Sequence, residues 1–345
     1  MKSSFSIKFK NYIKGILLSI ITPKIARLIR KSNPIISEEL NQCVVLLYHR
    51  VTNLTSDPQL LSVKPVNFSK HLDILTKKYN VLTVEEFCNC LKNRINFPKN
   101  SVLLTFDDGY ADNFLEAKPL LEEYKKQAIF YISTGILNTK KEFWWDAIER
   151  IILQSHNKIE REYFLMNEKK YFLQNLTDEA RKELYEELLR DMKVMRSESR
   201  EMKISELEEI FQADGPRESH RAMTFEELKK MNQSDSVIIG AHTHLHPSLA
   251  AQTYKDQYKE ISTSKKILEE LLKKKIDHFS YPFGGAVNYN QDTIEIVKGL
   301  GFEYVAANIP ILMTMKSDRF QFPRFLVRDW HAKEFEANLD QFFNN

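Results

Sequence analysis

Two adjacent carboxylates follow an apolar segment of the sequence. Residues 102–106 predict a buried strand, and Asp107 and Asp108 come directly after it. Neighbouring side chains at a strand end point in different directions, so one carboxylate can bind a metal ion while the other stays free to take a proton. Asp-Asp-Gly is also a good turn sequence, so this segment alone leaves a purely structural role open.

Histidines gather after a second apolar segment, where three of the nine lie within five residues. His242 and His246 are four apart, so on a helical turn they would share one face and hold one metal ion. On an extended strand, His244 would lie on that face as well. We predict a metal site here, with His244 as an alternative ligand.

A third segment, Phe279–Gly285, combines aromatic residues, a proline and two glycines. Such a segment can form a wall for a substrate and direct a backbone N–H at a reacting carbonyl oxygen. The alternative is an ordinary strand end.

The elements that would position these side chains alternate along the chain. Apolar segments predict strands at 44–48, 102–106, 128–132, 237–239, 278–281 and 304–307, with helical patterns between most of them. This alternation favours parallel βαβ units, in which functional residues follow the strand ends. Residues from about 140 to 225 break the pattern, because they are mostly charged and helical with no strong strand. We predict a helical insertion there, with Thr177 as a helix N-cap.

Composition is that of an ordinary globular protein, with 43% hydrophobic and 28% charged residues among 345. A net charge of +3 is too small to suggest nucleic-acid binding. Three cysteines are an odd and sparse set, which excludes a disulfide framework and favours free thiols in a reducing compartment. We therefore expect a cytoplasmic protein.

The charge is concentrated at the N-terminus, where residues 1–31 hold eight Lys or Arg and no acidic residue. The apolar segment 16–21 is too short to span a membrane, which takes about 20 apolar residues. We predict that residues 1–40 are a basic amphipathic segment that lies on the inner face of an anionic membrane, or a leader helix packed on the domain. Residues 41–345 would then form the catalytic domain.

Three segments resemble the first three motifs of the polysaccharide deacetylase family, the family-4 carbohydrate esterases. They are Thr105–Tyr110, His242–Pro247 and Phe279–Gly284, in the family's order. Two further segments, 46–51 and 143–146, resemble bacterial members near exopolysaccharide and lipopolysaccharide pathways. The resemblance implies a distorted (β/α) barrel with about seven parallel strands.

The resemblance also implies roles for single residues. Asp107 would be the general base, and Asp108, His242 and His246 would bind zinc or a similar divalent ion. Such an ion lowers the pKa of a water molecule and polarises a carbonyl group. The backbone N–H of Tyr281 would help to hold the tetrahedral oxyanion.

Two positions depart from the family pattern. Members often carry an arginine that orients the catalytic aspartate two residues before the motif proline, where this chain has Ser280. Arg324 is our candidate for that role, with Arg328 second. Many members also supply a late histidine as the general acid; His331 is a poor match, and His49 at the end of the first strand is better placed.

The leading hypothesis is a hydrolase that removes an N-acetyl group from an amino sugar in a glycan, a lipid-linked sugar or a nucleotide sugar. A second hypothesis is hydrolysis of another amide, such as a cyclic imide, on the same scaffold. A third is a non-catalytic carbohydrate-binding relic, which the complete Asp-Asp and His-x-x-x-His sets argue against.

Overall fold

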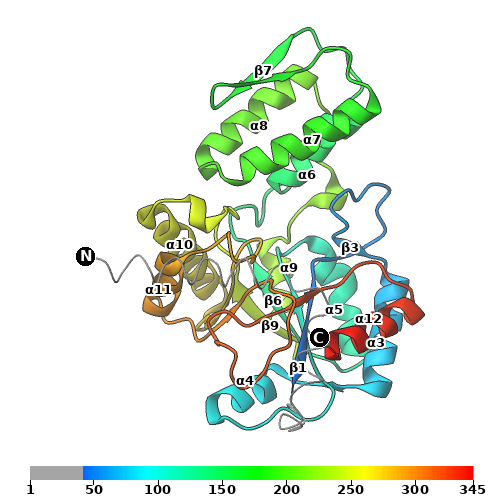
Figure 1. The fold of residues 1–345 in the computed structure, drawn as a ribbon, viewed down its shortest axis with the longest axis vertical. Coiled ribbons are helices and arrows are strands. Elements are labelled where there is room, and N and C mark those ends of the chain that lie inside the picture. The colour runs from blue at the N-terminus through cyan, green and yellow to red at the C-terminus, as the bar shows by residue number, and fades with distance from the viewer. Residues whose placement is uncertain (1–41, 345) are drawn as a thin grey trace, which may run out of the picture. The chain divides into compact units, whose positions relative to one another are not determined.

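A curved sheet of parallel strands forms the centre of the computed structural model, which describes residues 42–344. Seven strands follow one another in the order β11-β10-β9-β6-β5-β1-β12, and β4 pairs with β5 beside this path. Every neighbouring pair on the path is parallel. The strands are β1 (Cys43–Tyr48), β4 (Asn80–Val81), β5 (Ser101–Phe106), β6 (Ala128–Ile132), β9 (Val237–Ala241), β10 (His278–Ser280), β11 (Tyr304–Ala306) and β12 (Phe325–Leu326). The predicted distorted (β/α) barrel is confirmed, as a half-barrel with surrounding helices (Figure 1).

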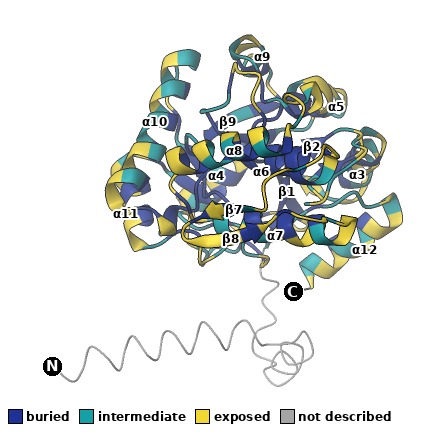
Figure 2. Cartoon of the chain, turned by 90° about the horizontal axis from the view of Figure 1, so that it is seen from above, coloured by how far each residue is buried: buried dark blue, intermediate teal, exposed yellow. Residues whose placement is uncertain are grey.

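Apolar residues on both sides of the sheet explain its burial. All six residues of β1, all six of β5 and all five of β6 are buried. Parallel strands covered by helices on their outer face read as continuous apolar segments, which is the pattern in the sequence. Figure 2 shows the strands as buried and the outer faces of the helices as exposed.

Helices connect the strands and begin where the sequence provides caps. Thr83, Thr253 and Asn290 each accept a hydrogen bond from a backbone N–H in the first turn of their helix. The barrel helices are α3 (Pro65–Lys78), α4 (Val84–Asn93), α5 (Lys118–Glu123), α9 (Phe225–Met231), α10 (Tyr254–Leu272), α11 (Gln291–Gly299) and α12 (Ala332–Phe343). Shorter elements are the strands β2 (Arg50–Val51) and β3 (Ser62–Val63), the π-helix η1 (Asn113–Ala117), and the 3-10 helices η3 (Glu218–His220) and η4 (Leu249–Ala251).

The segment before β12 joins the two edges of the half-barrel. Phe322 donates to the carbonyl of Val305 in β11, and the Ala307 N–H donates to the Phe322 carbonyl. A few residues later Phe325 pairs with Leu46 of β1. This crossing carries Arg324 through the interior of the barrel, where its side chain is fully buried.

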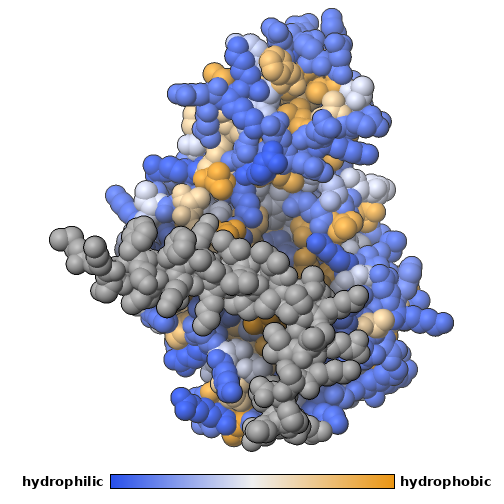
Figure 3. Space-filling model, in the orientation of Figure 1, coloured by the Kyte–Doolittle hydropathy of each residue, from blue (hydrophilic) through white to orange (hydrophobic). Residues whose placement is uncertain are grey.

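The region between β6 and α9 contains helices with a hydrophobic core of their own. Its elements are α6 (Trp144–Glu149), η2 (Arg150–Gln154), β7 (Tyr163–Met166), β8 (Lys169–Phe172), α7 (Asp178–Lys193) and α8 (Ser197–Phe211). Thr177 caps α7 as predicted. The sequence shows no strong strand in this region, but the structure contains two short ones, β7 and β8, which form an antiparallel hairpin. Figure 3 shows a mainly hydrophilic face with apolar side chains over this insertion, where Phe172 and Met202 are exposed.

The predicted membrane-contacting segment lies outside the described residues. Among the helices within residues 42–344, none is long and apolar enough to cross a membrane.

Candidate active site

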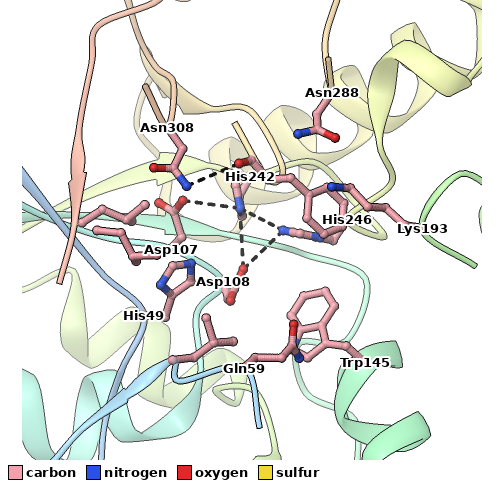
Figure 4. Close-up of a pocket in the computed structure, with 14 residues that line it drawn as sticks. His49, Gln59, Asp107, Asp108, Trp145, Lys193, His242, His246, Asn288 and Asn308 are labelled. Carbon is pink, nitrogen blue, oxygen red and sulfur yellow. Dashed lines mark hydrogen bonds and ion pairs between the residues drawn. The ribbon is translucent and has the colours of Figure 1, made fainter. Parts of the chain in front are cut away.

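The three sequence motifs meet at the carboxyl ends of β5, β9 and β10. Because these strands are parallel, the residues that follow them lie at one end of the sheet. Here they border a cavity of about 240 Å³. Figure 4 shows the side chains around it. The lining residues are Leu47, His49, Gln59, Leu61, Asp107, Asp108, Trp145, Lys193, His242, His246, Phe283, Asn288, Asn308 and Leu326.

The turn after β5 has an uncommon backbone that separates the two carboxylates. Asp108 has a φ of 79° and Gly109 a φ of 91°, both in the left-handed region. A Cβ at Gly109 would lie 3.2 Å from Ile132 side-chain atoms, so glycine fits both the angle and the close packing. A left-handed aspartate is uncommon, and such local strain often accompanies function.

Asp108, His242 and His246 converge on one point. The Nε2 atoms of the two histidines are 3.1 Å apart. The Asp108 Oδ1 lies 3.6 Å from the first and 3.4 Å from the second. Ligand atoms about 2.1 Å from a tetrahedral zinc ion are about 3.4 Å apart, so these spacings fit a single ion.

The chemistry of the three side chains also fits a cation. The Nδ1 of His242 lies 2.7 Å from the Ser280 carbonyl oxygen, which accepts its proton and leaves Nε2 free as a ligand. The buried Oδ1 of Asp108 has no hydrogen-bond partner among the described residues. Burial and the neighbouring Asp107 raise the pKa of Asp108 well above its usual range. A buried carboxylate without a donor is costly unless a cation neutralises it.

His244 points away from this set. Its Nδ1 lies 2.9 Å from the Thr134 hydroxyl, and its ring is only partly buried. The segment is neither a helical turn nor a strand, because Thr243 and His246 have φ values of 64° and 53°. These two left-handed residues bring His246 back beside His242 and turn His244 outward.

Asp107 is held by the guanidinium of Arg324, which directly precedes β12. Arg324 donates from Nη1 to Oδ1 and from Nη2 to Oδ2 of Asp107, each at 2.7 Å. The Ser280 hydroxyl accepts from Arg324 at 2.8 Å and donates to Asp107 at 3.1 Å. Serine at this position thus connects the arginine and the carboxylate. Further bonds to Thr105 and the Ala307 carbonyl fix the guanidinium in place.

These contacts set the ionisation of Asp107. Burial alone would raise the pKa of this carboxyl, but the positive charge and hydrogen bonds of Arg324, with a contribution from His242, outweigh it and lower the pKa to about 2. Asp107 is therefore ionised over the whole neutral range.

The structure separates the remaining residues that the sequence suggested as the general acid or as the orienting arginine. His49 lines the cavity with a buried Nδ1 that has no hydrogen-bond partner among residues 42–344. Burial lowers its pKa to about 4. His331 is exposed and contacts Asn67. Arg328 donates to the backbone carbonyls of residues 59 and 60 rather than to Asp107.

The role expected of Tyr281 needs correction. Its backbone N–H donates to the Ala306 carbonyl at 3.1 Å, as an extension of the β10–β11 pairing, so it is not available to a substrate. The side chain stacks on Tyr289 with ring centroids 4.0 Å apart, and its hydroxyl donates to the Phe320 carbonyl. Tyr281 is therefore part of the hydrophobic core.

Several cavity residues were not singled out as site residues in the sequence. Gln59, Asn288 and Asn308 come from loops without a recognisable motif, and Lys193 is the last residue of α7 in the insertion. Trp145 is the exception, since its neighbourhood belongs to one of the segments that resemble the family. Its Nε1 donates to the Tyr110 hydroxyl at 2.8 Å, beside the Asp-Asp-Gly turn.

A half-barrel with an Asp-His-His cluster that could hold a metal ion, and a second, arginine-bound aspartate at its carboxyl end, defines a class of α/β proteins with a hydrolase-like site. The family model described as polysaccharide deacetylase matches residues 94–203 and 215–305. That is more than half of the chain, so this protein belongs to the polysaccharide deacetylase family. His49 and Arg324 lie outside the matched ranges.

Individual relatives agree with this assignment. Over 94 residues the chain is 35% identical to YxkH of Bacillus subtilis (strain 168); the match covers 27% of this chain and about a third, 32%, of YxkH. The fold resembles the Streptococcus pyogenes deacetylase PplD in complex with acetate, with a TM-score of 0.57, 18% identity and coverage of 86% and 98% of the two chains. IcaB from Ammonifex degensii gives a TM-score of 0.53, 20% identity and coverage of 87% and 96%.

Proposed function

We propose that this protein hydrolyses the N-acetyl amide of an amino sugar with the help of one divalent metal ion. The observation that carries the proposal is the pairing of two carboxylates with opposite surroundings at one cavity. Asp108 faces two histidines and has no donor on Oδ1, whereas Asp107 is bound by Arg324. One group suits a cation and the other suits proton transfer, as amide hydrolysis requires.

The metal site consists of Asp108, His242 and His246. An ion held there supplies a more acidic water and polarises the acyl oxygen. Two nitrogens and one oxygen are a donor set that zinc accepts, so we propose zinc. The Ser280 carbonyl keeps the proton of His242 on Nδ1 and so holds Nε2 toward the site.

Asp107 acts as the base in this proposal. Since both of its oxygens accept from Arg324, the carboxylate cannot rotate freely, and its remaining lone pairs face the cavity. A carboxylate with a pKa of about 2 is a weak base, so it needs a water molecule that is already more acidic than bulk water.

His49 is the candidate acid for the departing amine. It lines the cavity, and a pKa of about 4 means that its ring is neutral before the reaction starts. It must therefore gain a proton during turnover before it can give one to the amine. The charge of Asp107 favours the protonated ring.

Asn308 replaces Tyr281 as the candidate donor to the oxyanion. Its side chain lines the cavity beside His242 (Figure 4). Its Nδ2 has a long contact of 3.5 Å with the Phe283 carbonyl oxygen, which is near the limit of a hydrogen bond. That amide can turn to a better acceptor when one enters the cavity.

The substrate is an N-acetylated carbohydrate. Trp145 offers an aromatic surface on the cavity, and Gln59, Asn288 and Asn308 offer amides that can bind hydroxyl groups. We also propose that the eight cations within residues 1–31 hold the protein at the inner face of an anionic membrane.

The test is acetate release from N-acetylglucosamine and its oligosaccharides by the zinc-loaded protein. We expect release that stops when a chelator removes the metal and returns when zinc is restored. Release of ammonia or a ring-opened acid from cyclic imides, without acetate release from any sugar, would replace this function with the other amide hydrolysis.

A further inference from the structure

One positively charged side chain at the cavity has no carboxylate partner among the described residues. Lys193 is the only lysine or arginine among the 14 lining residues. It comes from the end of α7, in the insertion, and Figure 4 shows it beside His246. It is not one of the three proposed metal ligands, Asp108, His242 and His246.

The structure fixes the position of Lys193 firmly against the histidine loop. Its backbone carbonyl accepts from the Ser248 N–H, two residues after His246, at 3.4 Å. Gln252 donates to the Met195 carbonyl at 3.1 Å, and Arg200 donates to the Leu245 carbonyl at 2.7 Å. Three bonds therefore hold the end of α7 and the start of α8 on the loop that carries His246.

The ammonium group of Lys193 lies over an aromatic ring and not beside a carboxylate. Its Nζ is 4.1 Å from the centroid of Phe283, and within residues 42–344 it forms no ion pair. The same ring contacts His246, with centroids 4.7 Å apart. Phe283 has a φ of 61°, which a bulky residue rarely adopts, so the backbone is strained here. Its ring contacts Lys193 on one side and the proposed metal ligand His246 on the other.

The other charges at the cavity are already paired. Arg324 neutralises Asp107, and Asp108 is one of the proposed metal ligands. The remaining polar side chains from Gln59, Asn288 and Asn308 are neutral. Lys193 is half-buried, and this partial burial lowers its pKa, so its charge lacks some of the solvation it would have in water. An anion that enters the cavity would restore that stabilisation.

We propose that Lys193 binds an anionic oxygen group, a phosphate or a carboxylate, that the substrate carries next to its N-acetylated sugar. This inference rests on the proposed function, because it specifies the substrate of the same cavity. It assigns the insertion the role of selecting charged over neutral amino sugars.

Calorimetric binding to the zinc-loaded protein tests the proposal without relying on turnover. The probes are N-acetylglucosamine, its 1-phosphate and its 3-O-lactyl ether, which carries a carboxylate. The variants are Lys193→Met, Lys193→Arg and the control Lys170→Met. Lys170 also lies over an aromatic ring, 4.3 Å from Tyr163, in the same insertion but away from the cavity.

We expect the wild-type protein to bind at least one anionic probe about tenfold or more tightly than the neutral sugar, the scale of a hydrogen bond to a charged group. Lys193→Met should remove most of that preference, Lys193→Arg should keep part of it, and Lys170→Met should leave it unchanged. The probe that gains more affinity identifies the group as phosphate or carboxylate.

Two results would overturn the proposal. One is equal affinity for charged and neutral sugars in the wild-type protein. The other is an anionic preference that survives in Lys193→Met, which would assign the anion to the metal ion. Acetate release measured in parallel separates this failure from a failure of the proposed function.

Discussion

Asp107 and Asp108 are neighbours in the chain, but their surroundings differ. Asp107 accepts three hydrogen bonds, two from Arg324 and one from Ser280, and its pKa falls to about 2. Asp108 is just as buried but has an oxygen without a donor, and its pKa rises. At the residue scale, two identical side chains therefore differ in ionisation, because Arg324 lowers the pKa of Asp107 while burial and the neighbouring Asp107 raise the pKa of Asp108.

The histidine pair predicts which substitutions remove the metal. His246→Ala should lower zinc content from one ion per chain to well below half, because two ligands no longer enclose the ion. His244→Ala is the matched control, since His244 faces Thr134 and should leave zinc content unchanged. Zinc content is measured by atomic spectroscopy on purified protein. Full occupancy in His246→Ala would show that the ion is held by other residues.

The two hydrogen bonds from the Arg324 guanidinium to Asp107 predict that Arg324→Lys affects turnover and not metal content. The charge remains but the two-pronged contact is lost, so turnover should fall about tenfold or more while bound zinc is retained. Circular dichroism and zinc content show whether the variant is folded and loaded. Turnover equal to that of the wild-type protein would leave Arg324 as a packing residue.

The candidate metal ligands and the candidate base could be predicted from the sequence, because they lie in short motifs that follow the strands. Asp107, Asp108, His242 and His246 lie within such motifs, and the structure brings them together. Tyr281 was misjudged because the sequence does not show that β11 extends far enough to pair with its N–H. Lys193 was missed because its proximity depends on how the end of α7 meets a loop more than 50 residues away.

At the element scale, a buried ion network joins the base of the insertion. Glu142 precedes α6 and has a fully buried carboxylate that accepts from Arg150 at 2.7 Å and from Arg217 at 2.6 Å. Arg150 also reaches Glu208 of α8 at 2.7 Å. These contacts connect the entry, the exit and the second long helix of the insertion.

Removal of the central carboxylate should therefore loosen the insertion. Glu142→Gln removes the carboxylate that Arg150 and Arg217 share, while Arg150 keeps Glu208 and Arg217 keeps Glu149 as partners. The free energy of unfolding should therefore fall by about 1.5–3 kcal/mol, the scale of a hydrogen bond to a charged group. Glu201→Gln is the control, because Glu201 pairs with Lys141 at the surface and should cost less than about 1 kcal/mol. Urea unfolding followed by circular dichroism compares the two. Equal losses would mean that the network adds nothing beyond a surface pair.

The elements of the barrel could be predicted from their apolar segments, and the hairpin β7–β8 could not. Its turn residues Asn167 and Glu168 both have positive φ values, which suits the hairpin turn, but glutamate replaces the glycine that usually signals it. The two-residue strand β12 is too short to give a pattern. It is specified by its pairing with β1, which comes from a distant part of the chain.

At the scale of the whole molecule, charge is divided unevenly along the chain. Eight Lys or Arg without an acidic residue occupy residues 1–31, and the remainder is net negative by about five charges. Such a segment can be drawn to an anionic bilayer with about 1 kcal/mol for each cation near the surface.

Vesicle flotation tests this arrangement. The full-length protein should float with phosphatidylserine-containing vesicles at low salt and dissociate as salt rises, because screening shortens the reach of the charges. A chain that starts at Ser37 should stay with the soluble fraction under both conditions. Equal flotation of the two proteins would remove the membrane role from residues 1–36.

The division of roles between the two aspartates is tested most directly by measuring zinc content and acetate release together in Asp107→Asn and Asp108→Asn. On a sugar that the wild-type protein deacetylates, Asp107→Asn should keep one zinc ion and lose about 10²-fold or more in rate, the scale of a general base. Asp108→Asn should lose both the metal and the activity. An Asp107→Asn protein that releases acetate at the wild-type rate, or that has lost its zinc, would contradict the account.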